Sequence, residues 1–224
     1  MGVIMLIEGT DLSLIYDIGK EYEAYAVRNL NIKLNIGEVV GIIGPSGSGK
    51  SSLLYLLSGL KSPTLGTVYY GDVDMESFSD LQKSDLRRKN FGFIFQRHFL
   101  IDYMTVFDNV LLASSEKDLK LAKTKTEELL HRLGMEKLSF KKPAKLSGGQ
   151  RQKVAIARAL INEPRIIFAD EPTASLDHNN ARAVMDMLEE QRESTTIVVV
   201  THDKSILTNA DRVLEMWDGY IKSC

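Results

Sequence analysis

Residues 44–52 read GPSGSGKSS, and they join the apolar run VVGII of residues 39–43 to the leucine-rich LLYLL of residues 53–57. This order predicts a strand, a glycine loop and a helix, and the loop fits the phosphate-binding pattern G-x-x-x-x-G-K-[ST]. Glycines allow backbone N–H groups to turn inward around a phosphate chain, and the helix that follows adds the positive end of its dipole. Lys50 is expected to contact the β- and γ-phosphates, and the Ser51 hydroxyl to bind Mg²⁺. The predicted nucleotide-binding residues of this loop are Gly44, Pro45, Ser46, Gly47, Ser48, Gly49, Lys50, Ser51 and Ser52.

The composition limits the class of protein. The chain has 224 residues, enough to bury a core without disulfides or metals, and its net charge of -2 gives no global reason to expect nucleic acid. The only cysteine is Cys224, which excludes a disulfide framework. No apolar run approaches the roughly 18–20 residues of a membrane helix, and the apolar N-terminus lacks the basic flank of a signal peptide. We therefore expect a soluble, cytoplasmic protein.

Alternation and apolar runs predict the strands. Residues 3–7 and 11–16 read as two strands separated by Glu8-Gly9-Thr10, and residues 30–36 alternate apolar with polar side chains. Such closely spaced strands are typical of an antiparallel sheet at the edge of a fold. Further strands are expected at residues 39–43, 67–71, 91–95, 166–170, 196–200 and 212–217. Among these, residues 166–170 are continuously apolar, as in a central parallel strand.

Helical patterns predict an inserted segment. Residues 118–133 carry leucines on one face, and residues 147–161 form a second helical region. Other helices are expected at residues 79–89, 179–193 and 204–210. The predicted fold is α/β: a P-loop NTPase core with a mainly parallel sheet, an N-terminal antiparallel β subdomain and an inserted α-helical subdomain.

One domain is expected to span residues 1–224. Within it, residues 1–96 and 164–224 would form the nucleotide-binding α/β core with its β subdomain. Residues 97–163 would form the helical subdomain.

Two carboxylates end the predicted strand at residues 166–170. In open α/β sheets, ligands bind outside the carboxyl ends of the strands, so Asp170 is placed to hold Mg²⁺ through water. Neighbouring strand residues point to opposite sides, so Glu171 can face an attacking water and act as its general base. An ordinary acidic strand end is the alternative.

Three further features lie near predicted strand or helix ends. The stretch LSGGQ, residues 146–150, places two glycines and a serine at a helix N-terminus, which can bind an anion. Capping by Ser147 explains the serine but not the paired glycines followed by glutamine. Gln96 ends an apolar strand and could sense the metal or the water. His202 follows the strand at residues 196–200, where it could contact the γ-phosphate and Glu171.

In this order, the motifs resemble those of the ATP-binding subunit of an ABC transporter. The resemblance matches the Walker A loop, the Q-loop at Gln96, the signature, the Walker B strand with its glutamate, the D-loop at residues 174–177 and the H-loop at His202. It implies ATP and Mg²⁺ as cofactors, catalytic roles for Glu171, His202 and Gln96, and metal contacts from Ser51, Gln96 and Asp170. Asp177 is the acidic residue of the implied D-loop.

The resemblance also implies a head-to-tail homodimer, in which the signature of one subunit closes on the ATP of the other. The signature residues are Leu146, Ser147, Gly148, Gly149 and Gln150. Tyr16 is implied as the aromatic side chain that stacks on adenine. Tyr22 and Tyr25 are alternatives for that role, and strand packing is the alternative for all three.

Several longer stretches of the sequence resemble those of an export branch of the family. The stretches RRKNFGFIFQ, TVFDNV and ADEPTASLD are similar to those of ATPases that serve permeases of the macrolide and lipoprotein-release type. The ending THDKSILTNADRVLEMWDG is similar to that of heme and glycolipid exporters. This implies an ATPase on the inner face of the cell membrane that powers a separate integral-membrane permease, with no nucleic acid partner. The alternative is a regulatory ATPase of a cell-division-type complex that moves no solute.

The contact with the permease is expected after Gln96. Residues 97–108 are rich in large apolar side chains, more than a small helical segment is expected to bury. We predict that Phe99, Leu100 and Tyr103 line a groove that receives a short cytoplasmic helix of the permease. Packing inside the helical segment is the alternative.

Overall fold

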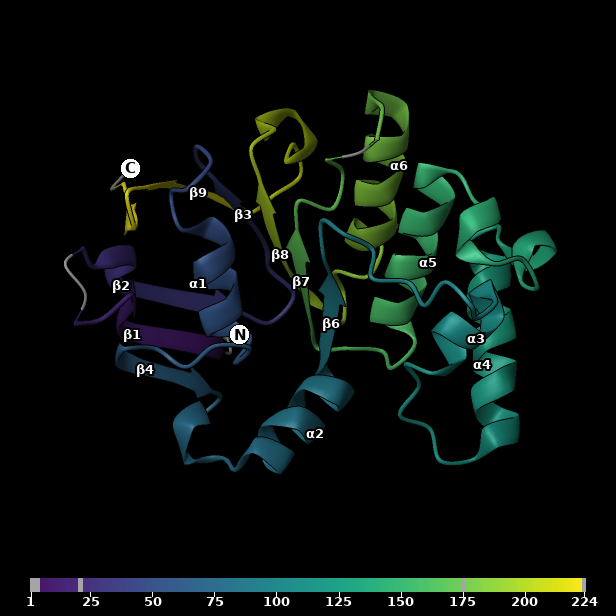
Figure 1. The fold of residues 1–224 in the computed structure, drawn as a ribbon, viewed down its shortest axis with the longest axis horizontal. Coiled ribbons are helices and arrows are strands. Elements are labelled where there is room, and N and C mark those ends of the chain that lie inside the picture. The colour runs from purple at the N-terminus through teal and green to yellow at the C-terminus, as the bar shows by residue number, and fades with distance from the viewer. Residues whose placement is uncertain (1–4, 20–21, 175, 223–224) are drawn as a thin grey trace.

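The computed structural model describes residues 5–19, 22–174 and 176–222, and it contains two sheets (Figure 1). The first is antiparallel with the strand order β2-β1-β4-β5, formed by Ala24–Asn35, Met5–Tyr16, Leu65–Tyr70 and Val73–Asp74. The second has the order β10-β9-β3-β8-β7-β6, formed by Tyr220–Ile221, Arg212–Trp217, Val39–Ile43, Thr196–Thr201, Ile166–Asp170 and Phe91–Ile94. Strands β9, β3, β8, β7 and β6 run parallel, and β10 pairs antiparallel with β9. The predicted fold class is confirmed.

The parallel strands separate two apolar cores. Alternate residues enter opposite cores, so Ile167 and Ala169 of β7 face one side and Ile166 and Phe168 face the other. On the second side, α1 (Lys50–Leu57) contacts strands of both sheets and fills the space between them (Figure 1). Both faces of β7 are therefore buried, as its continuously apolar sequence predicts.

The opposite core joins the sheet to the helices. Helices α5 (Gly148–Leu160) and α6 (His178–Glu189) pack their apolar faces there. Helices α3 (Val106–Leu111) and α4 (Leu119–Arg132) lie beyond α5, farthest from the antiparallel sheet (Figure 1). Two short 3-10 helices follow α4, at Glu136–Leu138 and Pro143–Lys145. One continuous core thus holds the helical segment against β6 and β7.

Helix α2 (Asp80–Asn90) leads directly into β6. Ser79 caps it, with Gln82 returning the hydrogen bond to the Ser79 backbone. No residue of α2 is buried, and its Leu86 packs, partly buried, against the apolar core. Within the described residues, no helix has the length and apolarity needed to cross a bilayer.

Two predicted elements are wrong. Residues 3–7 and 11–16 are not two strands in the described part, because β1 runs unbroken from Met5 to Tyr16. Gly9 pairs with Ile32 on one side and Val68 on the other. The register with β2 shifts between Gly9 and Leu12, and this bulge contains Asp11 at φ 51°.

The predicted helix at residues 204–210 is also wrong. Only a 3-10 turn forms, at Lys204–Ile206, with Asp203 as its cap. The chain must then enter β9, where Asp211 N donates to Val39 O and Val39 N donates to Asp211 Oδ2. This pairing with β3 competes with continuation of a helix.

Candidate functional site

The loop between β3 and α1 wraps around the side chain of Lys50. Lys50 is 7% exposed, and its Nζ donates to Gly44 O at 3.0 Å and Pro45 O at 2.9 Å. Gly49 has φ 100°, and a Cβ there would lie 1.9 Å from Ala26 O of β2. A Cβ on Gly44, at φ 152°, would lie 2.1 Å from Met216 O of β9. Strand β2 approaches the loop closely at Gly49, and β9 does so at Gly44. Both positions therefore require glycine.

An open pocket of 480 Å³ lies over this loop. It is lined by Tyr16, Ala26, Ser46, Gly47, Gly49, Lys50, Ser51, Ser52, Gln96, Glu171 and His202. Chain segments far apart in sequence thus contribute to one cavity. Gly44, Pro45 and Ser48 do not line the pocket: Ser48 is buried, and Gly44 and Pro45 supply the carbonyls that accept from Lys50.

The carboxylate of Asp170 lies behind Ser51 at the end of β7. Ser51 Oγ donates to Asp170 Oδ1 at 2.8 Å, and the Tyr55 hydroxyl donates to Oδ2 at 3.1 Å. Asp170 is 7% exposed, so both oxygens of a buried carboxylate have hydroxyl donors. A hydroxyl and a carboxylate at the foot of a phosphate loop are hard oxygen ligands, and this set fits Mg²⁺.

Sequence reasoning missed Tyr55, to which it gave no role. Burial, and next the negative charge of Asp170, raise the pKa of Tyr55 to about 12, so its hydroxyl remains a donor. The spacing in the sequence could have indicated this residue, because Tyr55 follows Ser51 by four residues and so lies on the same face of the helix.

Glu171 follows the last residue of β7, and its carboxylate contacts His202, whereas that of Asp170 contacts Ser51 and Tyr55. The Glu171 backbone is left-handed, with φ 49°, and its N–H donates to Val200 O at 2.8 Å. Both carboxylate oxygens lie 3.0 Å from His202 Nδ1. A strained non-glycine residue held by a neighbouring strand is a feature typical of active sites.

The three tyrosines have different surroundings. Tyr16 lines the pocket, and its hydroxyl lies 3.4 Å from Ser52 Oγ. Lys61 Nζ lies 4.4 Å from the centre of the Tyr16 ring. Tyr22 is 80% exposed and Tyr25 packs against Arg28, and neither lines the pocket.

The signature residues lie in a separate pocket, also of 480 Å³. Ser147, Gly148, Gly149 and Gln150 line it together with Asp177, and it shares no residue with the pocket over Lys50. Ser147 caps α5, and Gln150 completes the capping box. Leu146 is buried in the core beneath.

Asp177 forms the N-terminus of α6. Its Oδ1 accepts from Asn180 N at 3.0 Å, and this backbone hydrogen bond is the main cause that lowers its pKa. Ser175 of the implied D-loop lies outside the described residues. One chain therefore carries two separate polar pockets, each at a helix N-terminus.

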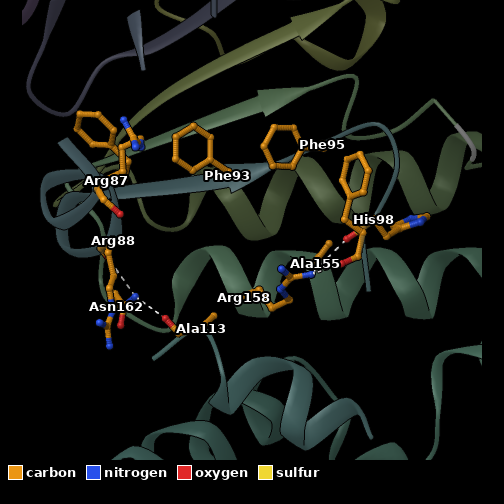
Figure 2. A pocket seen from close by; sticks show the side chains of 12 residues that line it. Arg87, Arg88, Phe93, Phe95, His98, Ala113, Ala155, Arg158 and Asn162 are labelled. Carbon is orange, nitrogen blue, oxygen red and sulfur yellow. Dashed lines mark hydrogen bonds between the residues drawn. The ribbon is translucent and has the colours of Figure 1, made fainter. Parts of the chain in front are cut away.

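A third cavity, of 350 Å³, lies between α2, β6 and α5 (Figure 2). Phe99 lines it and is 63% exposed. Leu100 does not line it, because its side chain packs against the apolar core. Tyr103, 76% exposed, also lies outside the lining. Of the three predicted groove residues, Phe99 lines this cavity, whereas Leu100 and Tyr103 do not, and the predicted contact with a permease helix stays a prediction.

Comparison with known proteins identifies relatives over nearly the whole chain. The family model described as "ABC transporter" matches residues 27–174. A lipoprotein-releasing system ATP-binding protein, LolD, from Psychrobacter arcticus is 39% identical over 220 residues, covering 96% of this chain and 97% of its own. An uncharacterized ABC transporter ATP-binding protein from Methanocaldococcus jannaschii is 42% identical over 219 residues, with coverage of 96% and 97%. Among solved structures, the dimeric post-hydrolysis state of the ATP-binding cassette MJ0796 bound to ADP and Pi is 35% identical, with a TM-score of 0.89 and 97% of each chain covered.

Proposed function

This chain belongs to the ABC transporter family as an ATP-binding subunit with ATPase activity, and from that premise we propose that it powers a separate integral-membrane permease of the export type. The observation that carries the proposal is the single pocket in which Lys50, Gln96, Glu171 and His202 meet. The relative named as part of a lipoprotein-releasing system supports the export type. Docked on its permease, the subunit would lie at the inner face of the cell membrane.

Two copies of the chain would complete each ATP site. The signature pocket and the pocket over Lys50 share no residue, so a head-to-tail homodimer could close one on the other. Related cassettes solved as dimers support this arrangement. Residues 97–163 would then be the helical unit that carries the signature, and residues 1–96 and 164–224 the nucleotide-binding unit.

The residues of the pocket take the following roles. Lys50 would contact the β- and γ-phosphates, and Ser51, Gln96 and, through water, Asp170 would hold Mg²⁺. Bound Mg²⁺ would neutralise charge that develops on the phosphate oxygens. Glu171 accepts a proton from the attacking water, and His202 orients the Glu171 carboxylate.

Tyr16 is the proposed adenine partner. Tyr16→Ala is expected to weaken ATP binding at least about fivefold, because stacking on a base contributes roughly 1–3 kcal/mol. Tyr22→Ala is the matched control and should bind ATP as the wild type does. Calorimetric titration with ATP measures both variants. Equal affinities for Tyr16→Ala and wild type would assign adenine to another side chain.

Tyr55→Phe tests the orientation of the metal carboxylate. Loss of one hydrogen bond to a charged group, about 1.5 kcal/mol, should raise the Mg²⁺ concentration needed for half-maximal ATP binding by roughly tenfold. Tyr70→Phe is the control, because it removes a half-buried hydroxyl that bonds to Asn90, away from the pocket. Titration of Mg²⁺ with a fluorescent ATP analogue gives the reading. An unchanged midpoint would show that Ser51 alone orients Asp170.

The proposed function is tested with the intact complex. A tagged chain, expressed in its native cells, should co-isolate in detergent with one integral-membrane permease, and the reconstituted pair should hydrolyse ATP faster than the subunit alone. A transport assay on the pair then separates an exporter from a regulatory ATPase. Isolation without any permease would contradict the proposal.

A further inference from the structure

The segment between α4 and α5 presents a phenylalanine to solvent. Phe140 is 85% exposed, and its ring stacks on that of Phe107 in α3 at a centroid distance of 6.5 Å. Two backbone hydrogen bonds fix the chain on either side of it. Phe107 N donates to Ser139 O at 2.8 Å, and Val106 N donates to Lys141 O at 2.9 Å. The segment is thus attached to α3, at the end of the molecule farthest from the antiparallel sheet, with most of the Phe140 ring left in water (Figure 1).

Lysines flank Phe140 on both sides. Residues 137–145 read KLSFKKPAK, with four lysines and no acidic residue. All four lysines are exposed, and none forms an ion pair or a side-chain hydrogen bond within residues 5–19, 22–174 and 176–222. The name basic loop is used below for Phe140 together with Lys137, Lys141, Lys142 and Lys145.

Two acidic residues beside the basic loop leave it positive. Glu136 directly precedes it, so residues 136–145 carry four lysines against one glutamate. Asp108 follows Phe107, but its carboxylate already accepts from the Thr105 N–H at 3.3 Å and from the Thr105 hydroxyl at 2.6 Å, in the cap of α3. The four charges therefore remain available to an anionic partner.

The residue types indicate which anionic partner fits. Lysine binds anions as a mobile point charge, without the fixed fork of arginine that matches one carboxylate, and this suits a fluid anionic surface. An exposed aromatic ring among lysines is the combination by which peripheral proteins bind the interface of a bilayer. Anionic lipids give the cytoplasmic leaflet a negative surface potential that attracts such clusters.

We propose that the basic loop binds the anionic headgroups of a phospholipid bilayer, with the Phe140 ring inserted at the boundary between headgroups and acyl chains. This goes beyond the proposed function, in which the permease alone brings the subunit to the membrane. Four lysines and one ring give a reversible contact. A permease that holds the subunit at the membrane would strengthen this contact, because it then forms within one assembly.

Co-sedimentation of the purified full-length chain with vesicles tests the proposal without any permease. One set of vesicles is phosphatidylcholine alone, and the other is two parts phosphatidylcholine to one part phosphatidylglycerol. The wild-type chain should bind the anionic vesicles and not the neutral ones. Salt at roughly 1 M should remove most of the binding, since the Debye length then falls to about 3 Å.

Lys141→Gln combined with Lys142→Gln should weaken binding to the anionic vesicles by roughly 25-fold, because each lysine near such a surface strengthens binding about fivefold. Lys120→Gln combined with Lys123→Gln is the matched control. It removes the same charge from exposed positions near the start of α4, whereas the basic loop follows the end of that helix. This control should bind as the wild type does.

Phe140→Ala should weaken binding at least about fivefold, because the ring no longer enters the apolar boundary. Leu81→Ala, which truncates an apolar side chain of α2 that is 83% exposed, is its control and should have no effect. Melting temperature and basal ATPase of all these variants should match those of the wild type, since every altered side chain is exposed.

Three results would each overturn the proposal: wild-type chain that stays off the anionic vesicles, equal binding to both kinds of vesicle, or undiminished binding by the variants of the basic loop. If the double lysine variant loses the permease on co-isolation while vesicle binding is unchanged, the basic loop contacts protein and the proposal is wrong. Because the vesicle assay contains no permease, its failure leaves the proposed function in place, and a failure to isolate a permease leaves this proposal in place.

Discussion

Glu171→Gln is expected to reduce ATP turnover by ~100-fold or more while leaving ATP binding intact. Glutamine keeps the size of the side chain and its contact with His202, but it cannot accept a proton from water, and loss of a general base has this typical scale. Because hydrolysis then no longer separates the subunits, the ATP-bound dimer should persist. Release of phosphate at saturating ATP and Mg²⁺ measures the turnover.

Glu163→Gln is a close control for this variant. Glu163 has the same backbone φ of 49° as Glu171, but its carboxylate pairs with Lys125, outside the pocket over Lys50. Both substitutions therefore place glutamine in a left-handed conformation, and only one removes the proposed base. Wild-type turnover in Glu171→Gln would assign the base to another residue.

Ser147→Arg should abolish ATP-dependent dimerisation and, with it, ATPase activity. The arginine side chain would fill the pocket formed by Gly148, Gly149 and Asp177, and so block approach of the second copy. ATP binding at Lys50 should be nearly unchanged, since the two pockets share no residue. Sedimentation of Ser147→Arg in the Glu171→Gln background, with and without ATP and Mg²⁺, provides the measurement.

The control must account for the helix cap that is lost together with Ser147. Ser79→Arg removes an equivalent cap and capping box, from α2, at a similar cost of about 1 kcal/mol. It should dimerise as the parent does. Nucleotide-dependent dimers in Ser147→Arg would rule out the composite site.

Short-range patterns in the sequence were sufficient for much of the fold and for the family. The GPSGSGKSS loop, the alternating strands and the Ser147 cap of α5 each depend on residues within a few positions of one another. The chain order of the motifs identified an ABC transporter ATP-binding subunit, which the relatives confirm. Local signals were misleading at residues 204–210, where pairing of Asp211 with Val39 ends the helix early.

Only the tertiary structure decided which distant side chains meet. Helical spacing places Tyr55 on the same face of α1 as Ser51, but only the packing of α1 against β7 brings its hydroxyl to Asp170, 115 positions away. All three tyrosines were candidates for the adenine contact, yet only Tyr16 lines the pocket once β1 and α1 pack together. Arg88 and Arg158 share a groove because α5 packs on β6, which α2 precedes in the chain. The periodicity of apolar residues shows which face of a helix or strand is buried. Packing between these elements determines which side chains from other elements lie opposite that face.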